Sequence, residues 1–469
     1  MDETEKLKNN IAKVATGYFL DTSVLEIADG KGTKVEAWNL ASMMLGFALK
    51  KNMLLIGEPG WGKTSAASII ASAGTGFPID LYRSVQISGH PDQSEEKMIG
   101  RPDYGSMMSG KEDVIWQKAL FFPSITLDEF NRLPEGKQAE LLDALATGRF
   151  SYLNDNFYYG DKCFFATVNH HDGGNHEISA PGLDRFHLCV EFAFPGAIYR
   201  GKVREFKASQ RSTLTDKDLT SRILEIIQDK GMPVKDKLEK IDSEREKAAK
   251  EYSKKSGIEP LTASEYRAFQ EKVAKIGMSQ DASLYMNCVD SEMNMTQKFG
   301  TKRSCDTIDD SNHAKELASK NIVNGLSPRA SIESIEDFAR ALAVYTGAEK
   351  VEKCHIDAAA PYALAHRVKF TDDFKSFHSE GVRGCIFEAY LAKKMLEGVS
   401  KNFEKYKNDL IMLEKYIENK NKGKTRKSKE GLSDEHWDRV EGMVKEDLRK
   451  IDYPLMREHV GFIKDVYRA

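Results

Sequence analysis

The stretch MLLIGEPGWGKTSAASII, residues 53–70, decides the fold that this sequence predicts. Its first four residues are apolar, as in a strand buried on both faces, and a glycine-rich turn follows them. The turn, residues 57–64, matches the pattern G-x-x-x-x-G-K-[ST] and leads into a helix of small residues. Glycines let backbone N–H groups curl around phosphates, and a helix directs its positive N-terminal end at the same anion. The stretch therefore predicts a phosphate-binding loop between a strand and a helix.

The loop and the first helical turn supply the candidate residues for binding ATP. Lys63 is expected to reach the β- and γ-phosphates, and the hydroxyl of Thr64 is expected to ligate Mg²⁺. The full set of candidate nucleotide-binding residues in this segment is Gly57, Glu58, Pro59, Gly60, Trp61, Gly62, Lys63, Thr64 and Ser65.

Length and composition favour a large soluble protein. The chain has 469 residues, a formal net charge of -3, 41% hydrophobic residues and 30% charged residues. No apolar run reaches the roughly 18 residues that a membrane-spanning helix needs, and the start MDETEKLKNN has no apolar signal core. We therefore expect a cytoplasmic protein with no membrane partner. The 6 cysteines are scattered without a CxxC pair, which favours neither a zinc site nor a disulfide framework.

Residues 52–195 alternate short apolar runs with helical patterns, which is typical of βαβ units around a parallel sheet. The predicted strands are residues 52–57, 124–128 and 163–168. Between the last two, the run FSYLNDNFYYG carries aromatic residues on both sides of Asn154-Asp155-Asn156, and it predicts a β-hairpin.

Changes in composition suggest four regions. These are a nucleotide-binding αβα core (1–205), a charged helical insertion (206–258), a helical lid (259–374) and a helical C-terminal extension (375–469). Residues 235–256 are so highly charged that we expect a solvated helix or a partly ordered insertion. The basic run KNKGKTRKSKE, residues 420–430, is expected to be a flexible solvated loop rather than a nucleic-acid patch.

A pair of carboxylates follows the second predicted strand, in PSITLDEFNRLP. Asp128 at the strand end is expected to hold Mg²⁺, so it joins the candidate metal ligands and nucleotide-binding residues. Glu129 can then activate a water molecule for attack on the γ-phosphate. An Asp-Glu pair is common in any protein. The catalytic interpretation of this pair is supported by the apolar strand that precedes it and by its distance in the sequence after Thr64.

Three further polar residues are candidates for catalysis. Asn169, just past the third strand in FFATVNHHDGG, could orient the attacking water or the γ-phosphate. Arg185 in APGLDRFHL could neutralise transition-state charge in a neighbouring subunit, and Arg329 could reach the γ-phosphate from the lid. Arg329 follows Ser327 and Pro328, which suit the start of a helix that ends near Gly347. The adjacent His170 and His171 are expected to be loop residues rather than metal ligands, because consecutive extended residues point in opposite directions.

The order of these motifs resembles the AAA+ ATPases, and within them the MoxR family. The segments that carry the resemblance are LDEFNRLP, ATVN, APGLDRF, GLSPRASI and HIDAAAPYALAHRV. The segment ISGHPDQSEEKMIG resembles the family's helix-2 insertion, and the hairpin before Asn169 resembles its pre-sensor hairpin. The resemblance implies an AAA+ αβα core with a parallel sheet, an α-helical lid and, beyond about residue 375, a helical extension.

The resemblance also implies roles and partners. Glu129 would be the catalytic carboxylate, Asn169 sensor 1, Arg185 a finger acting in trans and Arg329 sensor 2, with ATP and Mg²⁺ bound. Family members assemble as hexameric rings of identical subunits and remodel protein partners, many of which carry a von Willebrand factor A domain.

Other functions remain open at this point. Related rings act as motors on nucleic acid or as motor subunits of metal chelatases, and the same motifs would serve them. The acidic character of residues 86–100 argues mildly against nucleic acid, which prefers basic and aromatic loops. A scaffold that binds ATP without hydrolysing it is disfavoured by the intact pair Asp128-Glu129.

Overall fold

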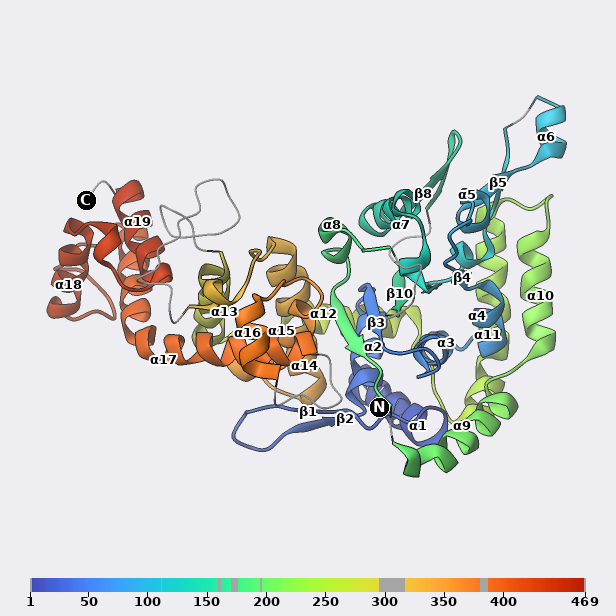
Figure 1. Ribbon diagram of the computed structural model, residues 1–469, viewed down its shortest axis with the longest axis horizontal. Helices are drawn as coiled ribbons and strands as arrows, with labels where there is room; N and C mark the ends of the chain where they lie inside the picture. The colour runs from blue at the N-terminus through green and yellow to red at the C-terminus, as the bar shows by residue number, and fades with distance from the viewer. Residues whose placement is uncertain are drawn as a thin grey trace. The chain divides into compact units, whose positions relative to one another are not determined.

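The structure is a computed structural model that describes residues 2–110, 112–158, 162–169, 176–194, 196–294, 317–379 and 387–467. The chain divides into two compact units (Figure 1). The first comprises Met1–Ile276 and Arg340–Glu349, and the second comprises Gly277–Ala339 and Lys350–Ala469.

The first unit is built on a parallel five-stranded sheet with the strand order β11-β3-β10-β7-β4. The strands are β3 (Met53–Ile56), β4 (Ile87–Ser88), β7 (Ser124–Asp128), β10 (Cys163–Val168) and β11 (Leu188–Glu191). All residues of β3 and β10 are buried, as the continuous apolar runs predict for strands covered on both faces. The three predicted strands are thereby confirmed.

The strand register brings the ends of the central strands together. β10 pairs with β3 through Val168 and Ile56, and with β7 through Ala166 and Leu127. β4 pairs with β7 through Ser88 and Asp128. Because all of these strands are parallel, the loops after β3, β7 and β10 leave the sheet at the same edge, where ligands of open α/β sheets bind.

Helices surround this sheet in the first unit. α2 packs against α3 and β11, while α3 also packs against β7 and β10. The helices of this unit are α1 (Glu3–Gly17), α2 (Trp38–Ala48), α3 (Lys63–Thr75), α4 (Ile79–Val85), α5 (Glu95–Met98), α6 (Tyr104–Met108), η1 (Lys118–Phe121), η2 (Phe130–Arg132), α7 (Glu135–Thr147), α8 (Ala180–Leu183), η3 (Ala197–Tyr199), α9 (Arg200–Thr213), α10 (Lys217–Gln228), α11 (Val234–Ser256) and α12 (Ala263–Lys275).

Three antiparallel hairpins accompany the sheet: β1 (Val24–Glu26) with β2 (Lys34–Glu36), β5 (Gly100–Pro102) with β6 (Val114–Trp116), and β8 (Arg149–Tyr152) with β9 (Asp155–Tyr158). The last is the predicted hairpin, but its turn lies one residue earlier than expected. Leu153 and Asn154 form the turn, with Leu153 at φ 51, so Asp155 and Asn156 belong to the second strand.

The charged segment 235–256 is a continuous helix, α11, that is attached to the first unit. It packs against α9 and α10, and Ile241 and Tyr252 are buried. The hydroxyl of Tyr252 lies 3.1 Å from Ser72 Oγ on α3. Three buried positions in a helix of 23 residues are enough to fix it, although its composition is that of a solvated helix.

The second unit is helical. Its elements are α13 (Gln280–Met293), η5 (Ala318–Asn321), η6 (Ala330–Glu336), α15 (Lys353–Leu364), α16 (Asp372–His378), α17 (Phe387–Asn421), α18 (Asp434–Lys445), η8 (Leu448–Lys450) and α19 (Pro454–Tyr467). α14 (Asp337–Thr346) contributes residues to both units. α17 packs against α13, α15, α18 and α19, so the segments predicted as lid and extension share one core.

The helix start at Ser327 is confirmed. The backbone N–H of Ala330 donates to Ser327 Oγ at 3.1 Å, and the helical segment ends before Gly347, which has φ 79. An α-helical period would place Ile332 on one helix face with Ile335, but the first turns are a π-helix. That wider turn rotates Ile332 outward, to 59% exposure, while Ile335 is fully buried.

A buried carboxylate joins helices of the second unit. Glu292 of α13 accepts hydrogen bonds from Tyr453 Oη at 2.8 Å, from Asn402 Nδ2 at 3.1 Å and from the N–H of Ala318 at 3.1 Å. Burial raises the pKa of Glu292, and the three donors counteract that shift. A buried polar group with all of these partners specifies one arrangement of α13, α17 and η5.

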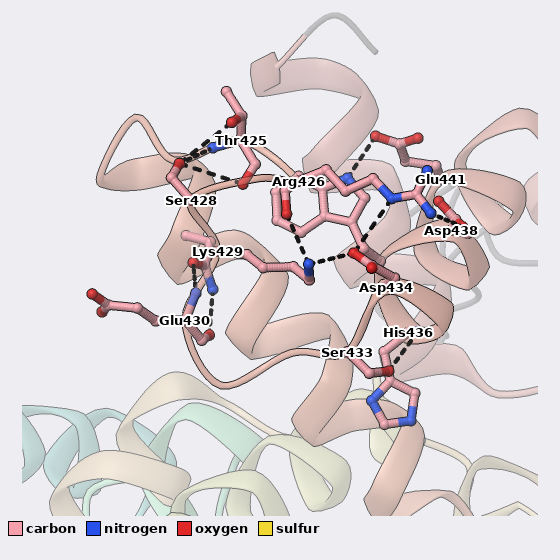
Figure 2. A network of polar contacts seen from close by, with 12 residues as sticks. Thr425, Arg426, Ser428, Lys429, Glu430, Ser433, Asp434, His436, Asp438 and Glu441 are labelled. Carbon is pink, nitrogen blue, oxygen red and sulfur yellow. Dashed lines mark hydrogen bonds and ion pairs between the residues drawn. The ribbon is translucent and has the colours of Figure 1, made fainter.

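The basic run 420–430 is an exposed loop held by ion pairs (Figure 2). Arg426 Nη2 lies 2.6 Å from Asp438 Oδ2, Lys429 pairs with Asp434, and Asn419 Nδ2 donates to the carbonyl of Glu430 at 2.9 Å. Each exposed pair contributes little, about 0–1 kcal/mol. Together they pair part of the basic charge with carboxylates in the first turns of α18. Less positive charge is then left in the loop to bind nucleic acid.

Candidate active site

The phosphate loop connects β3 to α3 in the conformation that the glycine pattern predicts. Gly57, Gly60 and Gly62 all have positive φ, at 151, 82 and 93. At Gly57 a Cβ atom would lie 2.4 Å from the carbonyl oxygen of Phe192, so a side chain is excluded by close approach as well. Among the described residues no side chain caps the N-terminus of α3, which leaves its N–H groups available for an anion. The loop therefore fits a nucleotide phosphate.

The remaining loop residues lie around this turn. Pro59 and Gly60 are exposed at its crest, while Glu58, Trp61 and Ser65 are partly exposed. Side chains at these positions are accessible to a bound nucleotide or to a neighbouring subunit.

The ammonium group of Lys63 is buried in the site and already has protein partners. Its Nζ donates to the carbonyls of Gly57 at 2.6 Å and Glu58 at 3.1 Å, and to Asn169 Oδ1 at 2.6 Å. Burial lowers the pKa of Lys63, while the carboxylates of Asp128, Glu58 and Glu129 act in the opposite direction. Three donors are thus satisfied, and a phosphate must exchange at least one of these bonds.

Thr64 and Asp128 meet at the start of α3. Thr64 Oγ1 donates to Asp128 Oδ1 at 2.6 Å. A hydroxyl and a carboxylate oxygen side by side are suitable ligands for Mg²⁺, which completes its octahedron with water and substrate phosphates. The described residues contain no cluster of three or more His, Cys, Asp or Glu that could hold a metal alone. The donor set fits a phosphate-bound Mg²⁺ rather than an all-protein metal cage.

Thr167 is a site residue that the sequence interpretation missed. Its Oγ1 donates to Asp128 Oδ1 at 2.7 Å and accepts the backbone N–H of Glu129 at 2.8 Å. The available signal was its spacing, because residues two apart along an extended segment, such as Thr167 in β10 and Asn169 just after it, point to the same side. Thr167 therefore fixes both carboxylate residues to β10.

We expect Thr167→Val to destabilise the first unit by about 1–3 kcal/mol, because the substitution removes this partner from two partly buried polar groups, the Asp128 carboxylate and the Glu129 N–H. The matched control is Thr126→Val on β7, since Thr126 Oγ1 is buried and has no hydrogen-bond partner among the described residues. Calorimetric unfolding of both variants tests the prediction. Equal midpoints for the two variants would contradict the bridging role of Thr167.

Glu129 sits immediately after β7 in a left-handed conformation, with φ 52 and ψ 47. Its carboxylate lies 2.9 Å from Arg132 Nη1 and accepts a hydrogen bond from Asn169 Nδ2 at 3.3 Å. A non-glycine residue in this region costs of order 1–3 kcal/mol and occurs most often at functional sites. The strained backbone is held by the bond from its N–H to Thr167.

Asn169 connects the phosphate loop to Glu129. Its side chain accepts from Lys63 and donates to Glu129, and its carbonyl accepts from Asn131 Nδ2 at 2.9 Å. Residues 170–175 lie outside the described residues, so the expectation for His170 and His171 stays a prediction.

The two candidate arginines belong to different units of the chain. Arg185 follows α8 and is partly exposed, and its carbonyl accepts from Asn52 Nδ2 at 3.1 Å. No hydrogen bond or ion pair among the described residues joins Arg185 to the phosphate loop of its own chain. Arg329 belongs to the second unit, where its Nε lies 3.3 Å from Glu333 Oε2.

The site combines a phosphate loop, two consecutive carboxylates after β7 and a polar residue after β10, all at one edge of a parallel sheet. This combination defines a nucleotide-hydrolysing domain of the P-loop class. The family model "AAA domain (dynein-related subfamily)" matches residues 52–186, and the model "AAA lid domain" matches residues 314–381. The chain therefore contains an AAA domain and an AAA lid, which confirms the predicted fold class and the predicted ATPase activity.

The chain was also compared with solved structures and with curated proteins. The crystal structure of "a putative ATPase" from Cytophaga hutchinsonii ATCC 33406 is similar in fold, with 16% sequence identity and a TM-score of 0.51. The similarity covers 85% of this chain and 94% of that one. No curated protein matches the chain. Among the described residues, none of the helices has the length and apolar character needed to cross a membrane.

Proposed function

We propose that this AAA+ ATPase is a ring-forming machine of the MoxR type that uses ATP hydrolysis to remodel protein partners. The observation that carries the proposal is a continuous connection from Glu129 to two projecting hairpins, β5–β6 and β8–β9. The hairpins offer exposed apolar side chains to a partner, and the segment that leads to β5 starts with a hydrogen bond from Gly89 to the backbone carbonyl of Asp128.

Two side-chain contacts join the two hairpins. The ring of Trp116 on β6 packs edge-on against Phe157 on β9, with centroids 5.5 Å apart. Asn154 Nδ2, in the turn of β8–β9, donates to Glu112 Oε2 at 2.8 Å. A displacement of one hairpin must therefore move the other.

The segment that leads to the β5–β6 arm contacts the backbone of Asp128 and Glu129. Gly89, directly after β4, donates its N–H to the carbonyl of Asp128 at 2.6 Å. A Cβ atom at Gly89 would lie 2.2 Å from the carbonyl oxygen of Glu129, so only glycine permits this contact. A change in the backbone at residues 128 and 129 during the ATP cycle would be transmitted to the arm that begins here.

The tips of the hairpins carry large exposed apolar side chains. Tyr104 is 64% exposed, Met108 93% and Leu153 54%. Methionine and aromatic side chains adapt to varied apolar surfaces, which suits the gripping of a protein segment. The resemblance to the MoxR family adds a specific candidate, a protein with a von Willebrand factor A domain.

The proposed chemistry uses the residues already described. Lys63 binds the phosphates, and Thr64 and Asp128 would hold Mg²⁺. Bound Mg²⁺ would neutralise the charge that develops on the phosphate oxygens. Glu129 accepts a proton from the attacking water, Asn169 orients that water, and Arg329 acts from the lid.

The proposed ring completes the site. AAA+ ATPases typically assemble as rings, and within the described part of the chain no hydrogen bond or ion pair joins Arg185 to the phosphate loop. An arginine from the next subunit would then supply positive charge to the transition state. The hexamer of identical subunits is the ring that the resemblance favours.

A motor acting on nucleic acid is the second candidate. Tyr104 and Tyr158 on the hairpins are 64% and 66% exposed, and Arg101 and Arg149 beside them are also exposed. Aromatic side chains with nearby positive charge are what single-stranded nucleic acid requires.

Capture with a Glu129→Gln variant tests the two candidates. With ATP, we expect this variant to retain a protein from cell extract after nuclease treatment, and to release it when ADP replaces ATP. Combining Glu129→Gln with Tyr104→Ala and Met108→Ala should abolish capture, whereas Ile198→Ala, a matched exposed residue at 94%, should not. Capture that nuclease abolishes would favour the nucleic-acid motor. Retention of protein by the hairpin variant would contradict the gripping surface.

A further inference from the structure

Arg132 is the charged side chain of the segment DEFNRLP that the proposed chemistry leaves without a task. It lies three residues after Glu129, and its Nη1 is 2.9 Å from Glu129 Oε2. We infer that Arg132 is a positioning residue, which holds the Glu129 carboxylate in the orientation that hydrolysis requires. This inference rests on the proposed role of Glu129 as the group that activates water.

Arg132 extends from a rigid backbone. The turn η2 places its N–H 2.9 Å from the carbonyl of Glu129, and the flanking residues Phe130 and Leu133 are buried. Phe130 packs edge-on against Phe186, with ring centroids 5.8 Å apart. Neighbouring Asn131 donates from its side chain to the carbonyl of Asn169. The guanidinium group therefore reaches Glu129 from a turn that is fixed to β10 and to the segment that carries Arg185.

Arg132 and Asn169 each hold one oxygen of the Glu129 carboxylate. One carboxylate oxygen faces Arg132 at 2.9 Å, and the other faces Asn169 Nδ2 at 3.3 Å. Glutamate has three rotatable side-chain bonds, so a single long hydrogen bond would leave several rotamers accessible. With both partners present, the carboxylate has one orientation.

ATP binding makes the restraint by Arg132 more important. Asn169 Oδ1 accepts from Lys63 Nζ at 2.6 Å, and a phosphate that draws Lys63 away leaves the Asn169 amide able to turn toward water or phosphate. The ion pair between Arg132 and Glu129 then remains as a restraint on the Glu129 carboxylate.

The geometry distinguishes this pair from an ordinary surface ion pair, which contributes little. The side chains of Arg132 and Glu129 are 34% and 31% exposed, and Glu129 has the strained backbone described above. A matched pair lies in the next helix, where Lys137 Nζ is 2.9 Å from Glu140 Oε1, also three residues apart. The matched pair has no contact with Glu129 or Asn169 among the described residues, so it serves as the control.

The test is a double-mutant cycle on ATP turnover by the full-length chain. We expect Arg132→Ala to lower kcat about 10- to 100-fold, which is the scale of a misplaced catalytic group, with KM for ATP unchanged within about twofold. Arg132→Lys should recover part of kcat. In a Glu129→Gln background, Arg132→Ala should have no further effect, because the carboxylate it positions is gone. Lys137→Ala should leave kcat unchanged.

Three outcomes would overturn the inference. They are wild-type or higher kcat for Arg132→Ala, an equal loss from Arg132→Ala in the Glu129→Gln background, and a loss of affinity for ATP that accounts for the whole effect. Thermal unfolding and the binding of a fluorescent ATP analogue show whether Arg132→Ala has misfolded. If it has, the kcat of Arg132→Lys is used to test the inference instead. Full activity of Glu129→Gln alone would instead refute the proposed role of Glu129.

Discussion

Replacing Glu129 with glutamine is expected to lower ATP turnover by about a hundredfold or more while ATP binding persists. Glutamine keeps the size of the side chain and can still contact Asn169, but its amide cannot accept a proton from water at neutral pH. Lys63, Thr64 and Asp128 keep their hydrogen bonds in this variant, so the phosphate and metal ligands remain in place. Steady-state phosphate release and equilibrium binding of ATP measure the two effects separately.

The control for this variant is Glu135→Gln, a nearby exposed carboxylate at the first turn of α7. We expect it to hydrolyse ATP at the wild-type rate. The catalytic assignment of Glu129 fails if Glu129→Gln retains full turnover, or if its turnover is lost only because ATP no longer binds. A stable complex with ATP, seen as a larger assembly in light scattering, would agree with a ring that cannot leave its ATP state.

Most of the fold could be predicted from the sequence because strand burial and turn geometry depend on residues that are close together in the chain. The apolar runs of β3, β7 and β10 can be buried on both faces only inside a covered sheet. Positive φ at Gly57, Gly60 and Gly62 follows from a loop that must wrap around an anion. Parallel strands then bring Asp128 and Asn169 to the same edge as Lys63, so these residues could be grouped without coordinates.

The missed features depend on contacts between distant segments. Thr167 and Arg132 look like ordinary strand and loop residues until β7 and β10 are paired and η2 is formed. The attachment of α11 depends on Tyr252 reaching Ser72 on another helix, which charge composition does not reveal. The π-helix that exposes Ile332 breaks the 3.6-residue period on which the sequence prediction relied.

Replacing Arg185 with alanine is expected to lower ATP turnover by about 10³-fold, the scale on which an arginine finger acts. Arg185 lies on a supported turn, since its carbonyl accepts from Asn52 and the N–H of His187, two residues further on, donates to the carbonyl of Asn52 at 2.7 Å. The loss should therefore reflect the missing guanidinium group rather than a rearranged loop. Arg222→Ala, which removes an exposed ion-paired arginine from the same unit, is the control and should remain active.

Mixing Arg185→Ala subunits with Lys63→Ala subunits tests whether the arginine acts across a subunit boundary. Each variant alone has every site defective, through the finger in one case and the phosphate ligand in the other. In mixed rings, some sites combine an intact Lys63 with an intact Arg185 from the neighbouring chain, so turnover should recover to a fraction of the wild-type rate. Recovery should vanish when the subunits are cross-linked into pure rings before mixing. If Arg185 acted on its own chain, no mixture would contain an intact site, and turnover would stay at the level of the separate variants.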